Sequence, residues 1–207
     1  MKATKTKSNE SRFGMSTSSR NGAMKGLFRE FLERVGEDPK RAGLLETPDR
    51  MDRMYRELLS GYDTDPRKIV NHAVFKSDYD EIILVKDIEF YSLCEHHVIP
   101  FYGVCHVAYI PDGKIIGLSK IPRVVDVFSR RLQIQERLTV EIADFLTGVL
   151  NPQGLALVMD GFHLCLAMRG AKKAHARMVT SAMLGVFKND PKTRMEFLNL
   201  IKSSDAR

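Results

Sequence analysis

The 207-residue sequence contains no long apolar run. No stretch approaches the roughly 18 uninterrupted apolar residues that a membrane-spanning helix needs, and the N-terminus lacks the apolar central region of a secretory signal. Cysteine is scarce as well: the chain has three, an odd number that argues against a disulfide framework. These absences predict a cytoplasmic protein with no membrane span, whose reduced thiols are available to a metal ion.

The body of the chain also has little net charge. The whole sequence carries +6, but residues 1–22 hold five Lys or Arg against Glu10 alone, so +4 lies there and +2 in the remainder. A nucleic-acid-binding protein would need this charge on its folded body. The distribution therefore argues against a nucleic-acid partner and favours a small anionic ligand, bound by a local cluster of Lys and Arg.

Residues 1–22 differ from the rest in composition. They are rich in Ser, Thr, Lys, Asn and Gly and have almost no large apolar side chains, which is typical of a segment that stays disordered. From Met24 onward, apolar residues recur at helical or strand spacing. The expected helices are residues 24–35, 47–59, 119–128, 138–149 and 190–201, and the expected strands are residues 82–90, 102–110, 155–159 and 163–168, with a turn or bulge at 160–161.

Four consecutive residues, Cys94-Glu95-His96-His97, carry most of the reactive groups. Cys94 and His97 have the spacing of a short chelating turn, and zinc accepts both thiolate and imidazole ligands. Cys165 is the candidate third ligand. Three protein ligands and a fourth position left to water are typical of catalytic zinc. The alternative is that Cys165 is a small buried residue of the core.

The segment around Cys165 contains further candidates. Side chains alternate along a strand, so we expect His163, Cys165 and Arg169 to share one face. His96 and His163 would then flank the metal, where imidazole suits a general acid or base. Either histidine alone is better explained as structural, and it is the pair beside one metal that favours a catalytic role. We expect Cys105, within an apolar strand, to lie in the core.

A basic group falls at an expected helix start. Lys120 and Arg123 follow Ser119 there, where the backbone amides and the helix dipole favour an anion. The alternative is that these side chains are simply solvated. Glu136 could pair with the amino edge of a guanine, or be an exposed helical glutamate.

Several motifs together resemble GTP cyclohydrolase I. In chain order they are T-P-D-R at 47–50, S-L-C-E-H-H at 92–97, G-L-S-K-I at 117–121, Q-E-R-L at 135–138, H-L-C at 163–165 followed by R-G at 169–170, T-S at 180–181 and D-P-K-T-R at 190–194. The resemblance covers residues 24–202 and implies an α+β subunit with the tunnelling fold. In that fold, a four-stranded antiparallel sheet carries two helices between its second and third strands, and N-terminal helices precede it.

The resemblance also implies the domains, the assembly and the site. We expect a disordered basic tail at 1–22, an N-terminal helical region at 23–66 and a catalytic domain at 67–207, in a homodecamer with active sites at subunit contacts. Zinc would be held by Cys94, His97 and Cys165, and His96 and His163 would handle protons. The implied substrate contacts are Gln135 and Glu136 for guanine, Ser119 near the ribose, and Arg50, Lys120, Arg123 and Arg169 for the triphosphate.

The implied reaction is zinc-dependent hydrolysis of GTP at C8, with loss of formate and rearrangement to 7,8-dihydroneopterin triphosphate, the first step of tetrahydrofolate and pterin biosynthesis. One alternative is a non-catalytic zinc-binding assembly protein with the same fold, which would bind metal without releasing formate from GTP. A zinc deaminase is a second alternative, but it would need H-x-E and C-x-x-C motifs, and the sequence has neither.

Overall fold

A computed structural model describes residues 22–202, so the expected disordered tail lies outside the described residues apart from Gly22. The chain divides into two compact units that meet between Glu57 and Leu58. The expected domain boundary at 66/67 stays a prediction. Among the helices of the described residues, none is both long enough and apolar enough to cross a membrane.

The first unit contains two of the expected helices, α2 (Ala23–Arg34) and α3 (Thr47–Leu58). The rings of Phe28 on α2 and Tyr55 on α3 stack with their centroids 5.4 Å apart. An ion pair of 2.7 Å joins Lys25 to Asp49. Proline in the first turn of α3 has its φ already set for a helix and lacks an N–H that would be unpaired there.

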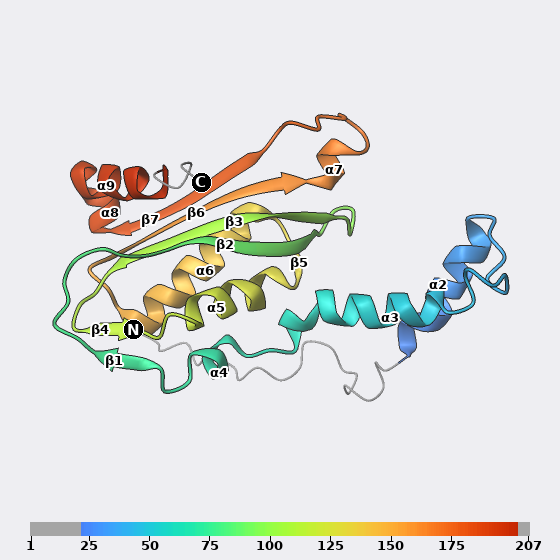
Figure 1. The fold of residues 1–207 in the computed structure, drawn as a ribbon, viewed down its shortest axis with the longest axis horizontal. Helices are drawn as coiled ribbons and strands as arrows, with labels where there is room; N and C mark the ends of the chain where they lie inside the picture. The colour runs from blue at the N-terminus through green and yellow to red at the C-terminus, as the bar shows by residue number, and fades with distance from the viewer. Residues whose placement is uncertain (1–21, 203–207) are drawn as a thin grey trace, which may run out of the picture. The chain divides into compact units, whose positions relative to one another are not determined.

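A five-stranded sheet dominates the second unit (Figure 1). Its strand order is β5-β2-β3-β6-β7, and all neighbours are antiparallel except the short parallel pair β5 and β2. The strands are β2 (Ile83–Cys94), β3 (Pro100–Ile110), β5 (Leu132–Gln133), β6 (Gly154–His163) and β7 (Met178–Gly185).

Two helices cover one face of this sheet (Figure 1). They are α5 (Lys120–Ser129) and α6 (Gln135–Leu150), and both lie between β3 and β6 in the chain. Fully buried side chains such as Phe90, Phe101 and Leu138 fill the layer between sheet and helices, and Cys105 lies among them as expected. Four long antiparallel strands with two helices between the second and third confirm the predicted tunnelling fold.

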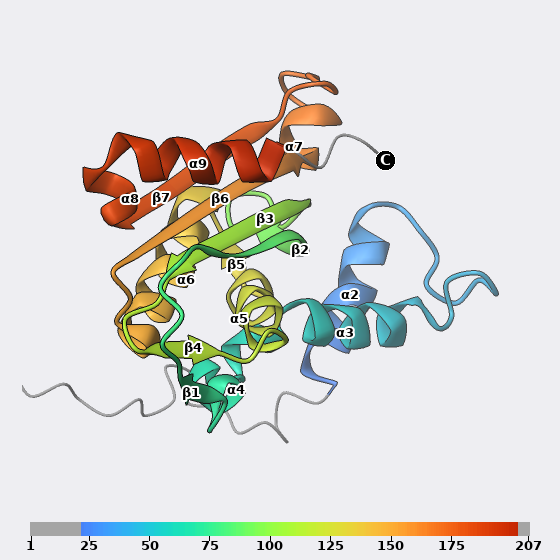
Figure 2. The same cartoon turned by 60° about the vertical axis from the view of Figure 1, so that its left-hand side comes forward.

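The C-terminal helices pack against the opposite face (Figure 2). They are α8 (Val186–Asn189) and α9 (Pro191–Lys202), and the edge-to-face rings of Phe187 and Phe197 join them, with centroids 5.8 Å apart. Asp190 caps α9 by accepting hydrogen bonds from Thr193. The smaller elements are η1 (Ser60–Tyr62), α4 (Pro66–Val70) and a two-stranded sheet of β1 (Val74–Lys76) and β4 (Lys114–Ile116).

The predicted turn at Asp160-Gly161 was wrong. Strand β6 is paired without a break through both residues, and Gly161 lies opposite Gly103 of β3. A Cβ atom at Gly103 would overlap the carbonyl of Asp160. The glycines therefore allow two strands to approach closely, which is the other common reason for glycine within a strand.

The predicted strand over residues 163–168 was also wrong. Phe101, next to the start of β3, pairs with His163, the last residue of β6. Beyond that point β3 contains only Pro100, which has no N–H to donate to another strand. The chain turns instead into the short helix α7 (Leu164–Ala167), which satisfies its backbone groups locally.

Candidate metal centre and active site

The loop between β2 and β3 closes on itself through backbone hydrogen bonds. The Cys94 N–H donates to the carbonyl of Ile99 at 2.9 Å, and the Val98 N–H donates to the carbonyl of Cys94 at 2.8 Å. Closing the loop puts Val98 at a φ of 53°. This left-handed conformation costs an L-residue about 1–2 kcal/mol and is an outlier for a β-branched side chain.

The loop presents two of three converging donor atoms. One ligand atom each from Cys94, His97 and Cys165 lie within 4.8 Å of one another, and Cys94 Sγ lies 3.8 Å from His97 Nδ1. Tetrahedral zinc with bonds of about 2.3 Å to sulfur and 2.0 Å to nitrogen places neighbouring ligand atoms roughly 3.5–3.8 Å apart. The three side chains therefore could hold a metal ion in nearly their present positions.

Cys165 reaches this group from α7 rather than from a strand. The alternation that grouped it with His163 and Arg169 was therefore wrong, although the three donors do converge. Burial and the neighbouring thiol of Cys94 raise the pKa of Cys165. A metal ion acts in the opposite direction, because coordination deprotonates a thiol.

The two remaining histidines of interest differ in their surroundings. His96 has a largely exposed side chain, with its Nδ1 atom 3.8 Å from Cys94 Sγ. His163 is half-buried, and its ring stacks on Phe101 with centroids 4.5 Å apart and planes only 6° apart. Burial lowers the pKa of His163, and the carboxylate of Glu136 opposes that shift. Its imidazole is therefore biased toward the neutral form.

The side chain of Gln135 contacts the imidazole ring of His163. Its Oε1 atom is 2.9 Å from His163 Nε2, and the residue is only 1% exposed. Its Nε2 atom donates to the carbonyls of Met159 and Met178 and to the hydroxyl of Thr180. The family resemblance implied a substrate contact for Gln135, and nothing in the sequence indicated these buried contacts.

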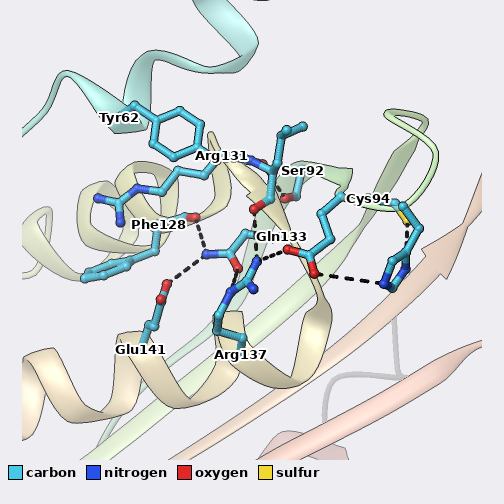
Figure 3. Close-up of polar contacts among 11 residues, drawn as sticks. Tyr62, Ser92, Cys94, Phe128, Arg131, Gln133, Arg137 and Glu141 are labelled. Atoms are coloured by element: carbon cyan, nitrogen blue, oxygen red, sulfur yellow. Dashed lines mark hydrogen bonds and ion pairs between the residues drawn. The ribbon is translucent and has the colours of Figure 1, made fainter. Parts of the chain in front are cut away.

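Arg137, in the first turn of α6, holds the loop between β2 and β3 (Figure 3). Its NH2 group donates to Glu95 Oε2 at 2.5 Å and to the carbonyl of Leu132 at 3.0 Å, and its Nε–H donates to Gln133 Oε1 at 2.9 Å. The hydrogen bond from Arg137 holds the pKa of Glu95 below its usual range. Outer contacts of this kind orient metal ligands, and no role was assigned to Arg137 from sequence.

The same network continues away from the loop (Figure 3). The buried amide of Gln133 donates to the carbonyl of Phe128 and to the carboxylate of Glu141, at 3.2 and 2.8 Å. The Tyr62 hydroxyl accepts the Leu132 N–H at 3.1 Å. The support for Cys94 thus involves β5, α5 and α6. Polar residues such as Gln133 among apolar neighbours were the available signal.

The predicted anion-binding residues lie on the surface. Arg123 at the start of α5, Arg169 beyond α7, and Arg50 on α3 in the other unit are exposed, and Lys120 is half-buried. Ser119 precedes α5, but its side chain makes no capping hydrogen bond. Their roles stay predictions.

The fold and the donor group define a class. The chain is a tunnelling-fold protein in which a loop and a short helix at one end of the sheet bring two cysteines and a histidine together.

Comparison with known proteins identifies the family. The GTP cyclohydrolase I family model matches residues 24–202. The GTP cyclohydrolase 1 of Chlorobaculum tepidum is 56% identical over 180 residues, covering 87% of this chain and 80% of that protein. The one from Leptospira biflexa is 53% identical over 180 residues, covering 87% and 98%. The chain belongs to the GTP cyclohydrolase I family of enzymes.

One solved structure shows a partial likeness. It is the crystal structure of the archaeosine synthase QueF-Like in the apo form, 18% identical, with a TM-score of 0.44, covering 53% of this chain and 97% of that one.

Proposed function

We propose that this enzyme hydrolyses GTP at C8, releases formate and rearranges the product to 7,8-dihydroneopterin triphosphate, the first step of tetrahydrofolate and pterin biosynthesis. The observation that carries this proposal is the convergence of Cys94, His97 and Cys165 within 4.8 Å in a chain more than half identical to proteins named GTP cyclohydrolase 1.

The donor set fits zinc. Two thiolates and one imidazole are preferred zinc ligands, and three protein ligands leave the open position that catalytic sites keep. Zinc held there would activate water for attack at neutral pH and polarise the reacting group. Glu95, whose position is fixed by its hydrogen bond from Arg137, would hold the loop in place while zinc binds to its three ligands.

We assign His163 to the purine ring. Its imidazole is half-buried and stacked on Phe101, and a positioned imidazole suits a general acid and base. Protonating N7 of the purine would make C8 electrophilic and open the ring after attack by water. His96, exposed beside Cys94, and Ser119 would carry protons in the later steps.

The guanine and the triphosphate would be bound by different elements. Glu136, in the first turn of α6, would accept from the guanine N–H and amino groups, and its charge already acts on His163. Gln135, which is buried beside Glu136, would assist Glu136 in binding guanine. The triphosphate would be bound at the α5 start and by two further arginines. These contacts are Lys120, Arg123, Arg169 and Arg50.

We further propose a homodecamer with active sites at subunit contacts, in which some of these arginines come from a neighbouring subunit. Residues 67–207 would be the catalytic domain and residues 23–66 its helical region. A cytoplasmic location stays a prediction.

Incubating the purified, zinc-loaded protein with GTP tests the proposal. We expect one formate per GTP consumed and a product that becomes a fluorescent pterin on oxidation. The matched control is the same preparation with its zinc removed by a chelator and then restored, which should lose and regain both signals. Bound zinc without formate release would instead support the non-catalytic assembly protein.

A further inference from the structure

The orientation of the Gln135 side-chain amide is fixed by its surroundings. Two backbone carbonyls, of Met159 and Met178, lie 3.1 and 2.8 Å from its Nε2 atom. A carbonyl oxygen only accepts hydrogen bonds, so the NH₂ group must face this pair. The amide oxygen must then face the other way, toward His163.

The hydroxyl of Thr180 is consistent with this orientation. It lies 3.1 Å from Gln135 Nε2 and 2.7 Å from Thr139 Oγ1, and Thr139 Oγ1 in turn donates to the carbonyl of Gln135 at 2.7 Å. Thr180 can accept from the amide and donate to Thr139. Every polar group of the network has a partner, as buried networks require.

This orientation determines which nitrogen of His163 carries a hydrogen. Gln135 Oε1 has no proton to give, so at 2.9 Å from His163 Nε2 it can only accept one. In the neutral imidazole, one ring nitrogen donates and the other accepts. Nε2 is then the protonated nitrogen, and Nδ1 is the nitrogen able to take up a proton.

Ring stacking cannot make this selection. The Phe101 ring lies parallel to the imidazole, and a half-turn of the imidazole about its Cβ–Cγ bond would preserve the stack. That turn would place a carbon against Gln135 Oε1 and leave a buried acceptor unpaired. The amide therefore fixes both the ring orientation and the tautomer.

Gly161 leaves the space in which this hydrogen bond forms. A Cβ atom at this position would overlap Gln135 Oε1 and come within 3.5 Å of His163 Nε2. Replacing Gly161 by alanine would therefore disturb the contact while leaving both partners in the chain.

We propose that Gln135 is a positioning residue that holds His163 as the Nε2–H tautomer, so that Nδ1 is the nitrogen that exchanges a proton with the substrate. The catalytic meaning of this tautomer rests on the proposed function, whereas the tautomer itself does not. The general rule is that the hydrogen bond made by one ring nitrogen of a histidine determines the state of the other; here the bond from Nε2–H to Gln135 leaves Nδ1 unprotonated.

The tautomer can be measured without turnover. The experiment is nitrogen NMR of the full-length, zinc-loaded protein labelled with ¹⁵N-histidine, at a pH where the imidazole is neutral, with the His163 signals identified by their loss in His163→Ala. We expect a single Nε2–H form in the wild type. An Nδ1–H form or an even mixture there would overturn the proposal, whether or not the protein releases formate from GTP.

Two variants should disturb the tautomer and one should not. Gln135→Met and Gly161→Ala should give a mixture of tautomers and lower kcat for formate release by about 100-fold, the lower end of the range for acid–base groups. Gly161→Ala keeps the Gln135 side chain that is proposed to contact guanine, so its KM should be little changed. Thr180→Val is the matched control, since the two carbonyls still orient the amide, and it should keep the Nε2–H form. A wild-type spectrum from Gln135→Met would refute the role of Gln135.

A protein that shows the Nε2–H form but releases no formate from GTP would contradict the proposed function and leave this assignment standing.

Discussion

Two cysteine-histidine groups on neighbouring strands of one sheet have different surroundings. Cys94 lies at the end of β2, where His97 and Cys165 converge on it. Cys105 lies in the middle of β3 with His106 beside it in sequence. Both cysteines are buried, at 6% and 0% exposed, so burial alone does not distinguish a ligand from a core residue.

The difference comes from where each cysteine lies along its strand. In the middle of a strand, His106 points to the face opposite Cys105, and its Nδ1 atom accepts the Asp87 N–H at 3.1 Å. At a strand end, a loop and a helix can bring additional donors to the same point. Burial alone raises the pKa of Cys105, which keeps that thiol protonated and unreactive.

The largest expected effect comes from removing one donor at the strand end. Cys165→Ser should lose both bound zinc and formate release, because a serine hydroxyl is a poor zinc ligand and two donors do not hold the ion. Metal content after dialysis and formate release from GTP measure the two losses. An active variant with a full complement of metal would refute ligation by Cys165.

Cys105→Ser is the matched control for that variant. It makes the same chemical change in the middle of the sheet, where it should cost about 1–3 kcal/mol of unfolding free energy by burying a hydroxyl, with the metal content unchanged. Equal metal loss in both variants would remove the contrast between the two cysteines.

The second effect is on turnover alone. His163→Ala should keep its zinc and lower kcat by about 10²- to 10⁴-fold, because the proton carrier is lost and the three donors remain. Metal analysis measures zinc binding, and single-turnover formate release measures the chemical step, so the two measurements together separate loss of metal from loss of the proton carrier. Loss of zinc from this variant would count against the division of roles.

A smaller effect is expected from the support of the loop. Arg137→Ala should speed zinc release to a chelator by about tenfold, because contacts that orient ligands typically contribute 10- to 100-fold. Arg137→Lys should recover only part of this, since lysine cannot span Glu95 and Gln133 with a planar fork. An unchanged release rate in Arg137→Ala would show that the loop holds its ligands unaided.

The smallest effect concerns His106. Burial lowers its pKa from the usual 6.5, and the charge of Asp87 partly opposes that shift. The unfolded chain therefore binds the proton more readily, so the folded protein loses stability as pH falls through about 6.5 toward the lower folded pKa. Above that range, the neutral ring costs nothing.

His106→Gln tests this effect. A glutamine oxygen can still accept the Asp87 N–H but does not titrate. Urea unfolding at pH 7.5 and 5.5 should show a smaller loss of stability at acid pH in this variant than in the wild type, with zinc content and turnover unchanged. An identical pH dependence would exclude His106 as its source.

The sequence was sufficient to predict the main helices and strands and the convergence of Cys94, His97 and Cys165. Apolar periodicity found the strands that flank Cys94 and both helices between β3 and β6. Cys94 and His97 are only three positions apart, so their proximity can be predicted without knowing how distant segments pair. Cys165 does converge with Cys94 and His97 as expected, but from a short helix and not from a strand, because strand pairing depends on where β3 starts and periodicity does not show that.

The supporting contacts could not be predicted. Gln135 and Arg137 are two residues apart on α6 and act on different parts of the site, one on His163 and one on Glu95. These partners are 28 and 42 positions away in the chain. Composition and spacing report which side chains are polar, but only the pairing of distant segments reveals which atoms they meet.

The closed loop around Val98 affects the stability of the protein from which zinc has been removed. Hydrogen bonds from Cys94 to Ile99 and from Val98 to Cys94 close the backbone of this loop, so the loop should keep its conformation when zinc is withdrawn, unlike small domains that unfold without their metal. A chelator should therefore strip the centre and leave the circular dichroism spectrum intact. The metal-free site could then be loaded with cobalt, whose visible absorption would report the number of sulfur ligands directly.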